Sequence, residues 1–316
     1  MRYTHTFTLS CALLALSAGH AAWAADPESC TTIRMPEPGW ADISATNAIA
    51  GIVLEALGYH QKADTLSVPI IYRGLQMGQA DVFLGNWMPA QKPMVEGPLQ
   101  DGSIVSLQSN LDQAKFTLAV PSYVAAAGVK SFADLQKHAD RFGHKIYGIE
   151  AGAPANRNIQ NMIKAKDFNL GDWQLVESSE AGMLSQVTRK VAAKDFVVFL
   201  AWEPHAMNTK FKLNYLAGGD AYFGPNYGSA SVHTVTRKGF ASQCPNAGKL
   251  FAQMKFNVDL ENRIISDILD KKQDAKVATR AALKQSPELL ASWLAGVQTT
   301  QGGDGLAAVK KALQLK

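Results

Sequence analysis

Short apolar strands alternate with amphipathic helices along this chain, and the alternation begins twice. In the first run, residues 31–35 are predicted as a strand. A helix is predicted to follow, from an N-cap at Ser44 to Leu57. Two further strands are predicted at residues 68–72 and 81–85, with a short helix between them. This order is typical of an α/β protein with a parallel sheet flanked by helices.

The second run starts after an apolar strand at residues 116–120. Its predicted elements are a strand at 144–149, helices at 154–166 and 178–191, and a strand at 196–201. Because the chain is long for one simple core, two lobes are expected. We therefore expect a bilobal α/β binding-protein fold, with two parallel-type sheets and a ligand cleft between the lobes.

The expected lobe limits follow from where the pattern restarts. No low-complexity linker separates the two runs, so short strand crossings should join the lobes. Amphipathic helices dominate from about residue 246 and are expected to return to the first lobe. The first lobe is thus expected to comprise residues 25–115 and 215–316, and the second lobe residues 116–214.

The N-terminus has the pattern of an export signal. Arg2 precedes an apolar run at residues 7–18, and Ala22-Trp23-Ala24 resembles a cleavage site. The apolar run is too short to span a bilayer. We therefore expect residues 1–24 to be a signal peptide and the rest to be a soluble, exported protein in the periplasm.

The chain has three cysteines, and their pairing depends on whether the protein is in an oxidising compartment. Cys11 lies in the expected signal, which leaves Cys30 and Cys244. An oxidising compartment favours a disulfide between these two, and two independent thiols are the alternative. If they are bridged, the start of the mature chain is tied to the segment that precedes the C-terminal helices.

Composition and motifs argue against several function classes. The formal charge of +4 is mild, and basic residues do not cluster with aromatic ones, so nucleic acid is not an expected partner. Neither histidine spacing for a metal, nor a nucleophile elbow for a hydrolase, nor a phosphate-binding glycine loop is found. Glu203 and His205 are interpreted as hydrogen-bonding support for a strand end. We expect a monomer that is not an enzyme and has no cofactor or metal.

Two apolar strands end in the same way. DVFLGNWMPA at 81–90 and FVVFLAWEPH at 196–205 both place a tryptophan two residues before a proline. Ligands of open α/β sheets bind at the carboxyl ends of strands, so Trp87 and Trp202 should face a cleft, and Trp40 follows the first strand. Three indoles can form a cage for a quaternary ammonium group, whereas a single Trp more often packs in a core. Packing is the role expected of Trp173 and Trp293.

The sequence resembles the periplasmic choline-binding proteins of quaternary-ammonium ABC importers, which are related to glycine betaine binders. The motifs that carry the resemblance are PEPGWADI, FLGNWMP, ESSEAGMLSQV, VVFLAWEPHAMNT and YFGPNYGSASVHTVTRKGF, followed by Cys244. The resemblance implies a cage of Trp40, Trp87 and Trp202, a nearby carboxylate from Asp42, and an inner-membrane permease and ATPase as partners. The family's fourth aromatic residue, a tyrosine, is matched here by Phe116.

A second departure from the family concerns the ligand. Choline binders tend to have Glu-Pro-Gly-Asn where this chain has Glu-Ala-Gly-Ala, which ends at Ala153. Extra room beside the predicted helix at 154–166, with Asn156 nearby, would suit a carboxylate at the helix N-terminus. We therefore expect L-carnitine to be favoured over choline or glycine betaine. A ligand sensor that docks on a signalling receptor is the alternative function.

Overall fold

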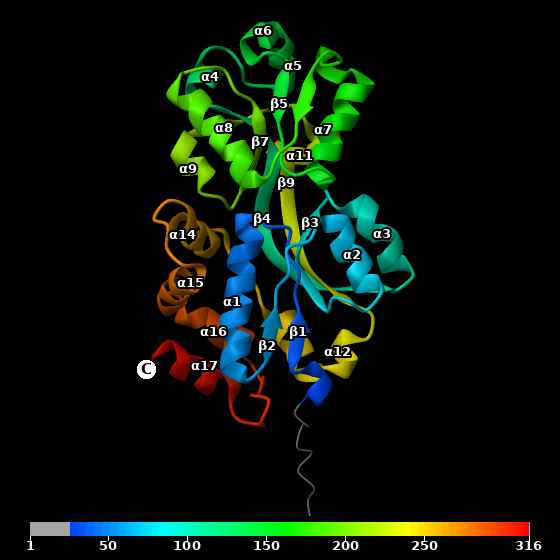
Figure 1. Cartoon of the computed structure of the whole chain (residues 1–316), viewed down its shortest axis with the longest axis vertical. Helices are drawn as coiled ribbons and strands as arrows, with labels where there is room; N and C mark the ends of the chain where they lie inside the picture. The colour runs from blue at the N-terminus through cyan, green and yellow to red at the C-terminus, as the bar shows by residue number, and fades with distance from the viewer. Residues whose placement is uncertain (1–25, 316) are drawn as a thin grey trace, which may run out of the picture.

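The computed structural model describes residues 26–315, and its two lobes are stacked along the long axis (Figure 1). The expected signal peptide lies outside the described residues. No helix among residues 26–315 is long and apolar enough to cross a membrane. The bilobal α/β class predicted from the sequence is confirmed.

One lobe, the lower one in Figure 1, contains both ends of the described chain. Its N-terminal elements are β1 (Thr32–Arg34), α1 (Ala41–Leu57), β2 (His60–Lys62), α2 (Val68–Gln76), β3 (Val82–Met88) and α3 (Lys92–Gln100). Its C-terminal helices are α12 (Phe240–Gln243), α13 (Pro245–Gln253), α14 (Val258–Leu269), α15 (Ala275–Lys284), α16 (Pro287–Trp293) and α17 (Gly305–Leu313). Helices α14, α15 and α17, from the end of the chain, pack against α1.

The other lobe is built from the middle of the chain. Its helices are α4 (Ser122–Ala126), α5 (Phe132–Leu135), α6 (Ala139–Phe142), α7 (Pro154–Ala165), α8 (Glu180–Ala192) and α9 (Met207–Phe211). Its strands are β5 (Lys145–Tyr147), β6 (Gln174–Val176), β7 (Phe199–Glu203) and β8 (Leu213–Tyr215). The short helices α10 (Asp220–Phe223) and α11 (Pro225–Gly228) follow β8.

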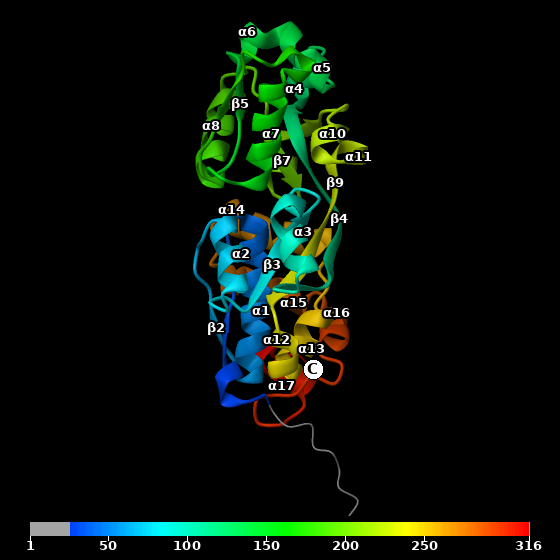
Figure 2. The same cartoon turned by 90° about the vertical axis from the view of Figure 1, so that its right-hand side faces the viewer.

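Two long strands connect the lobes, β4 (Ile104–Pro121) and β9 (Ser229–Arg237) (Figure 2). They belong to a seven-stranded sheet with the order β3-β9-β4-β7-β5-β6, in which β8 also pairs with β4. Strand β4 pairs antiparallel with β9 in the first lobe and antiparallel with β7 in the second. The seven-stranded sheet is therefore mixed, not parallel throughout as predicted; its parallel strand pairs within residues 26–315 are β5–β6 and β5–β7, whereas β1 and β2 form a separate two-stranded parallel sheet.

Two local predictions were wrong. Residues 68–72 belong to helix α2, not to a strand: Pro69 occupies the first turn, and Val68, Ile71, Tyr72 and Leu75 are buried at helical spacing. Helix α1 begins at Ala41 and not at a cap on Ser44. The end of α1 was predicted correctly, because Gly58 terminates it with a left-handed φ of 93°.

The Cys30–Cys244 disulfide is confirmed, with Cα atoms 5.8 Å apart. Cys30 ends the turn before β1, and Cys244 lies between α12 and α13. The bond closes a loop of 214 residues between the two ends of the first lobe. It thus fastens the N-terminal strand to the returning C-terminal helices.

The contacts of the residues that precede β9 indicate where the second lobe ends. Helix α10 packs against α7, and Asn158 donates a side-chain hydrogen bond of 2.7 Å to the carbonyl oxygen of Tyr222. We therefore propose that residues 116–228 form the second lobe, which extends the predicted limit of residue 214. On this division the chain crosses between lobes along β4 and β9.

Candidate functional site

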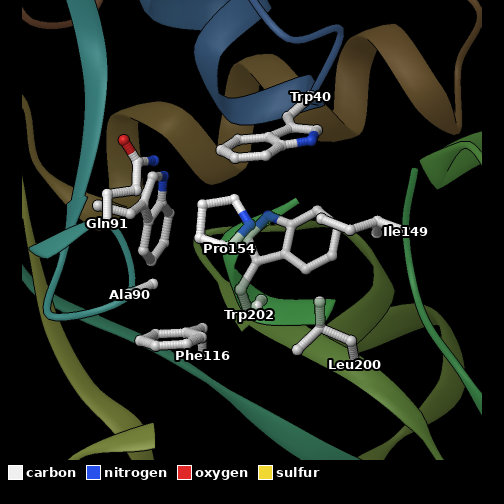
Figure 3. Close-up of a pocket in the computed structure, with 10 residues that line it drawn as sticks. Trp40, Ala90, Gln91, Phe116, Ile149, Pro154, Leu200 and Trp202 are labelled. Atoms are coloured by element: carbon white, nitrogen blue, oxygen red, sulfur yellow. The ribbon is translucent and has the colours of Figure 1, made fainter. Parts of the chain in front are cut away.

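Four aromatic side chains from separate elements surround one cavity (Figure 3). Trp87 and Trp202 are each the next-to-last residue of their strands, β3 and β7. Trp40 is the N-cap residue of α1, and Phe116 on β4 lies opposite Trp202 in the sheet register. The structure therefore brings together all four aromatic residues that the sequence predicted. We call them the aromatic cage.

The prolines after the two strand-end tryptophans turn the chain at the cavity. Both Met88-Pro89 and Glu203-Pro204 are cis peptide bonds, so the two Trp-x-Pro segments share a backbone feature as well as a sequence pattern. Pro89 leads into Ala90 and Gln91, which line the cavity beside Trp87. The motif thus ends a strand in both places, and after Trp87 it also leads the chain along the cavity wall.

The cavity is almost free of polar groups. It encloses about 380 Å³, counting space open to solvent. Besides the aromatic cage, its walls are Ala90, Gln91, Ile149, Pro154, Ala155 and Leu200. No lining residue carries a formal charge, and each cage ring is 7% exposed or less. A ligand here would contact aromatic faces and aliphatic groups in a site largely shielded from water.

Carboxylates lie directly behind two of the rings. Trp87 donates its indole N–H to Asp42 over 3.0 Å, and Trp40 donates its indole N–H to both oxygens of Glu150 at 3.0 and 3.1 Å. The indole N–H groups are thereby satisfied outside the cavity wall, which leaves ring carbons to face the cavity (Figure 3). A negative group bonded to the indole edge also strengthens the negative potential of the ring face.

Burial perturbs the ionisation of these acids. Desolvation, together with the negative charge of Glu180, raises the pKa of Asp42 from 3.8 to about 7, although the Trp87 hydrogen bond opposes the shift. Desolvation also raises the pKa of Glu150. The pKa of Glu261, a buried residue of α14, is raised well above its ordinary value by desolvation and by Asp42. A cation in the cage would favour the charged forms of these acids.

Three predicted site residues lie outside the cavity wall. Asp42 contacts the cage only through Trp87. Ala153 is buried at the N-cap of α7, next to the lining residue Pro154. The Asn156 side chain bonds to the backbone N–H and C=O of Ile149 and to the carbonyl oxygen of Glu150. Asn156 therefore shapes the loop that carries the cavity wall, and its polar atoms face that loop.

Sequence reasoning missed the aliphatic part of the wall. Leu200 could have been found, because it lies two residues before Trp202 on the same strand and so shares its face. Gln91 is fully buried and donates to the carbonyl oxygen of Gly85 over 2.7 Å, while its side-chain oxygen accepts from Tyr72. The sequence gives no sign that this polar residue lines an apolar cavity, because the turn after Pro89 places Gln91 there.

The remaining residues singled out in the sequence have supporting roles. Glu203 forms an ion pair with Lys115 over 3.1 Å, and His205 donates to Glu180 over 3.0 Å, which agrees with their interpretation as local support. Trp173 packs on Phe142 and Trp293 packs on Phe256. Both of these tryptophans are buried, so the prediction that they serve packing is confirmed.

Comparison with known proteins places the chain in a family. Residues 31–285 match the substrate-binding domain of the ABC-type glycine betaine transport system, and the chain belongs to this family. Members of this family bind substrates for transport and are not enzymes. The protein is accordingly a substrate-binding protein of a glycine betaine/choline type of ABC transporter.

Individual relatives support this assignment. An ABC-transporter choline-binding protein in complex with choline is 48% identical, with a TM-score of 0.89, and the match covers 91% of this chain and all of that one. Lactococcal OpuAC complexed with glycine betaine is 25% identical, with a TM-score of 0.75 over 83% of this chain and 98% of its own. The glycine betaine/carnitine transport binding protein GbuC of Listeria monocytogenes is 30% identical over 52% of this chain and 54% of its own.

The raised pKa of Asp42 predicts a pH-dependent cost to folding. The unfolded chain loses the Asp42 proton near pH 4, whereas the folded chain keeps it until about pH 7. The folded state thus binds more protons in this window and loses stability as pH rises through it. We expect Asp42→Asn to stabilise the ligand-free protein more at pH 8 than at pH 5, by roughly 2 kcal/mol in denaturant titrations. Exposed Asp64→Asn is the control, and an equal effect of Asp42→Asn at both pH values would contradict the prediction.

Proposed function

We propose that the protein captures a quaternary ammonium compound in the aromatic cage in the periplasm and delivers it to the permease and ATPase of an ABC importer. The observation that carries the proposal is the cage itself, four aromatic rings around a nearly uncharged cavity with carboxylates behind two of them. Transport is favoured over ligand sensing because the chain belongs to a transport family.

The chemistry of the walls suits a methylated cation. A trimethylammonium group cannot donate hydrogen bonds, so it needs no acceptor in the wall and gains from aromatic faces on several sides. A primary ammonium group would instead leave its N–H groups without partners, which is costly in a shielded site. Apart from the indole N–H groups of the tryptophans, the polar side chain among the lining residues is that of Gln91, and its amide already bonds to Gly85 and Tyr72.

Within this class, the charges around the cage favour choline. Asp42, Glu150 and Glu180 surround it, and no lining residue is a cation. Arg157, the nearest cation in the α7 segment, is exposed. A ligand with its own carboxylate would be repelled by the acids and would find no cation in the wall. The likeness to a protein solved with choline supports the same choice.

L-carnitine is the second candidate, and a different feature favours it. Ala153, the N-cap residue of α7, has a smaller side chain than the asparagine that choline binders tend to have there, and the next residues, Pro154 and Ala155, line the cavity. Backbone N–H groups and the helix dipole at that end attract a carboxylate. A carnitine tail that pointed toward α7 would benefit from this field, although Glu150 lies in the same loop.

Capture in the cage predicts a separation between binding and folding effects. Trp202→Leu keeps an apolar side chain but removes the aromatic face, so choline binding should weaken by about 2 kcal/mol in calorimetry. Trp173→Leu removes an indole that packs away from the cavity and should lower the melting temperature while leaving affinity unchanged. Unchanged affinity in Trp202→Leu together with a large loss of stability would assign Trp202 to the core and contradict the proposal.

The choice between choline and carnitine can be tested at Ala153. We expect the native protein to bind choline more tightly than carnitine. Asparagine is a favourable N-cap residue, so Ala153→Asn should fold, fill the space beside α7 and offer choline's hydroxyl a partner. The preference for choline should then increase by about 1 kcal/mol. Ala151→Asn, an exposed change in the same loop, is the control. Tighter binding of carnitine by the native protein would show that the space at Ala153 outweighs the acids.

A further inference from the structure

Helix α1 begins at the cage, where the second lobe supplies a hydrogen-bond acceptor for its first turn. Its N-cap residue, Trp40, provides no side-chain hydrogen bond to the first turn. The backbone N–H of Ala41 belongs to the first turn, where no acceptor within the helix is available. This N–H donates to Glu180 Oε2 over 3.0 Å. Glu180 is the first residue of α8 in the second lobe, so the helix of one lobe is capped by a carboxylate of the other.

A second contact of the same kind lies one residue earlier. The Trp40 indole N–H donates to Glu150, which precedes α7 in the second lobe. Residues 40 and 41 of the first lobe are therefore both held by carboxylates of the second lobe. These two carboxylates come from different elements and reach across 110 and 139 residues of sequence.

Glu180 is oriented by its own lobe. Its Oε1 accepts from His205 Nε2 over 3.0 Å, and His205 Nδ1 accepts from the backbone N–H of Met207 over 3.0 Å. Both Glu180 and His205 are buried. One oxygen of Glu180 is thus fixed by His205, and the other is left to meet Ala41. The His205 ring also packs edge-on against Trp202, with ring centroids 5.0 Å apart.

These contacts form one chain between cage residues of opposite lobes. It runs from Trp202 through His205 and Glu180 to the backbone of Ala41, the residue that follows Trp40. Separation of the lobes would break the bonds of Glu180 and Glu150 to the first lobe but not the bond between Glu180 and His205. The Glu180 carboxylate is therefore already oriented by His205 when the first lobe approaches.

We propose that Glu180, with Glu150, forms an inter-lobe latch that exists only when the lobes are closed, positions Trp40 over the ligand and slows ligand release. The proposal rests on the proposed function, in which the lobes close over a quaternary ammonium compound. Glu180 acts through Ala41 and is a positioning residue, because it does not line the cavity.

Release kinetics with choline test the latch, and the cage tryptophans supply the fluorescence signal in stopped-flow experiments. Loss of a hydrogen bond to a charged acceptor should raise the dissociation rate of Glu180→Ala about tenfold or more. The association rate should change by less than about twofold, because the latch forms after encounter. Glu180→Gln keeps an oxygen that can accept from Ala41 and should recover part of the loss. Glu150→Ala should also release choline faster.

Glu288→Ala is the matched control, since Glu288 is an exposed residue of α16 in the first lobe, far from the lobe contact. A lower melting temperature of ligand-free Glu180→Ala with an unchanged dissociation rate would overturn the latch and leave a simple helix cap. Equal rates in Glu180→Ala, Glu150→Ala and the native protein would overturn it as well. If Glu180→Ala does not fold, the choline dissociation rates of Glu180→Gln and Glu150→Ala test the latch in its place.

Failure of the proposed function gives a different result from failure of the latch. If the native protein binds neither choline, carnitine nor glycine betaine, the proposed function is wrong. If the native protein binds one of these compounds but releases it as fast as Glu180→Ala and Glu150→Ala do, the proposed function stands and only the latch is wrong.

Discussion

Trp87 donates its indole N–H to Asp42, Trp40 donates to Glu150, and the geometry of the cage depends on these two hydrogen bonds. A buried indole needs a partner for its N–H, and here the partners stand behind the rings, so the carbon faces are directed to the cavity. The same carboxylates place negative charge close to the cavity without entering its wall. An apolar wall with acids behind it attracts a cation that makes no hydrogen bonds and disfavours ligands that require them.

The two long strands β4 and β9 position these groups. Phe116 on β4 lies opposite Trp202 on β7, and Trp87 on β3 lies opposite Val232 on β9. Trp87, Phe116 and Trp202 are thus attached to a sheet that runs through both lobes, whereas Trp40 is attached to α1 and donates a hydrogen bond to Glu150 of the second lobe. The hydrogen bonds of Glu180 and Glu150 to the first lobe both lie at the start of α1.

The sequence predicted the features that depend on local pattern. The apolar runs before Trp87 and Trp202 marked two strand ends, and Cys30 and Cys244 predicted the disulfide. Residues 68–72 were predicted as a strand because Val, Ile and Tyr favour strands. They form the start of helix α2 instead, with a proline in its first turn and buried side chains at helical spacing. The first half of β4 includes a mostly polar stretch, residues 108–113, and its pairing with β9 is interrupted by register shifts, so the sequence showed no regular alternation and the full length of β4 was missed. The contact of Glu180 with Ala41 joins residues 139 apart, and no local pattern contains it.

The central claim is that aromatic faces backed by carboxylates bind the positive charge of the ligand, beyond its apolar surface. Titration calorimetry of the native protein with choline and with 3,3-dimethylbutan-1-ol, its uncharged carbon analogue of nearly the same shape, tests this claim directly. If desolvated cation–π contacts supply about 2 kcal/mol or more, choline should bind at least roughly 30-fold more tightly than the alcohol. Equal affinities for the two compounds would show that the cavity selects for shape and apolar burial alone, and would contradict the account.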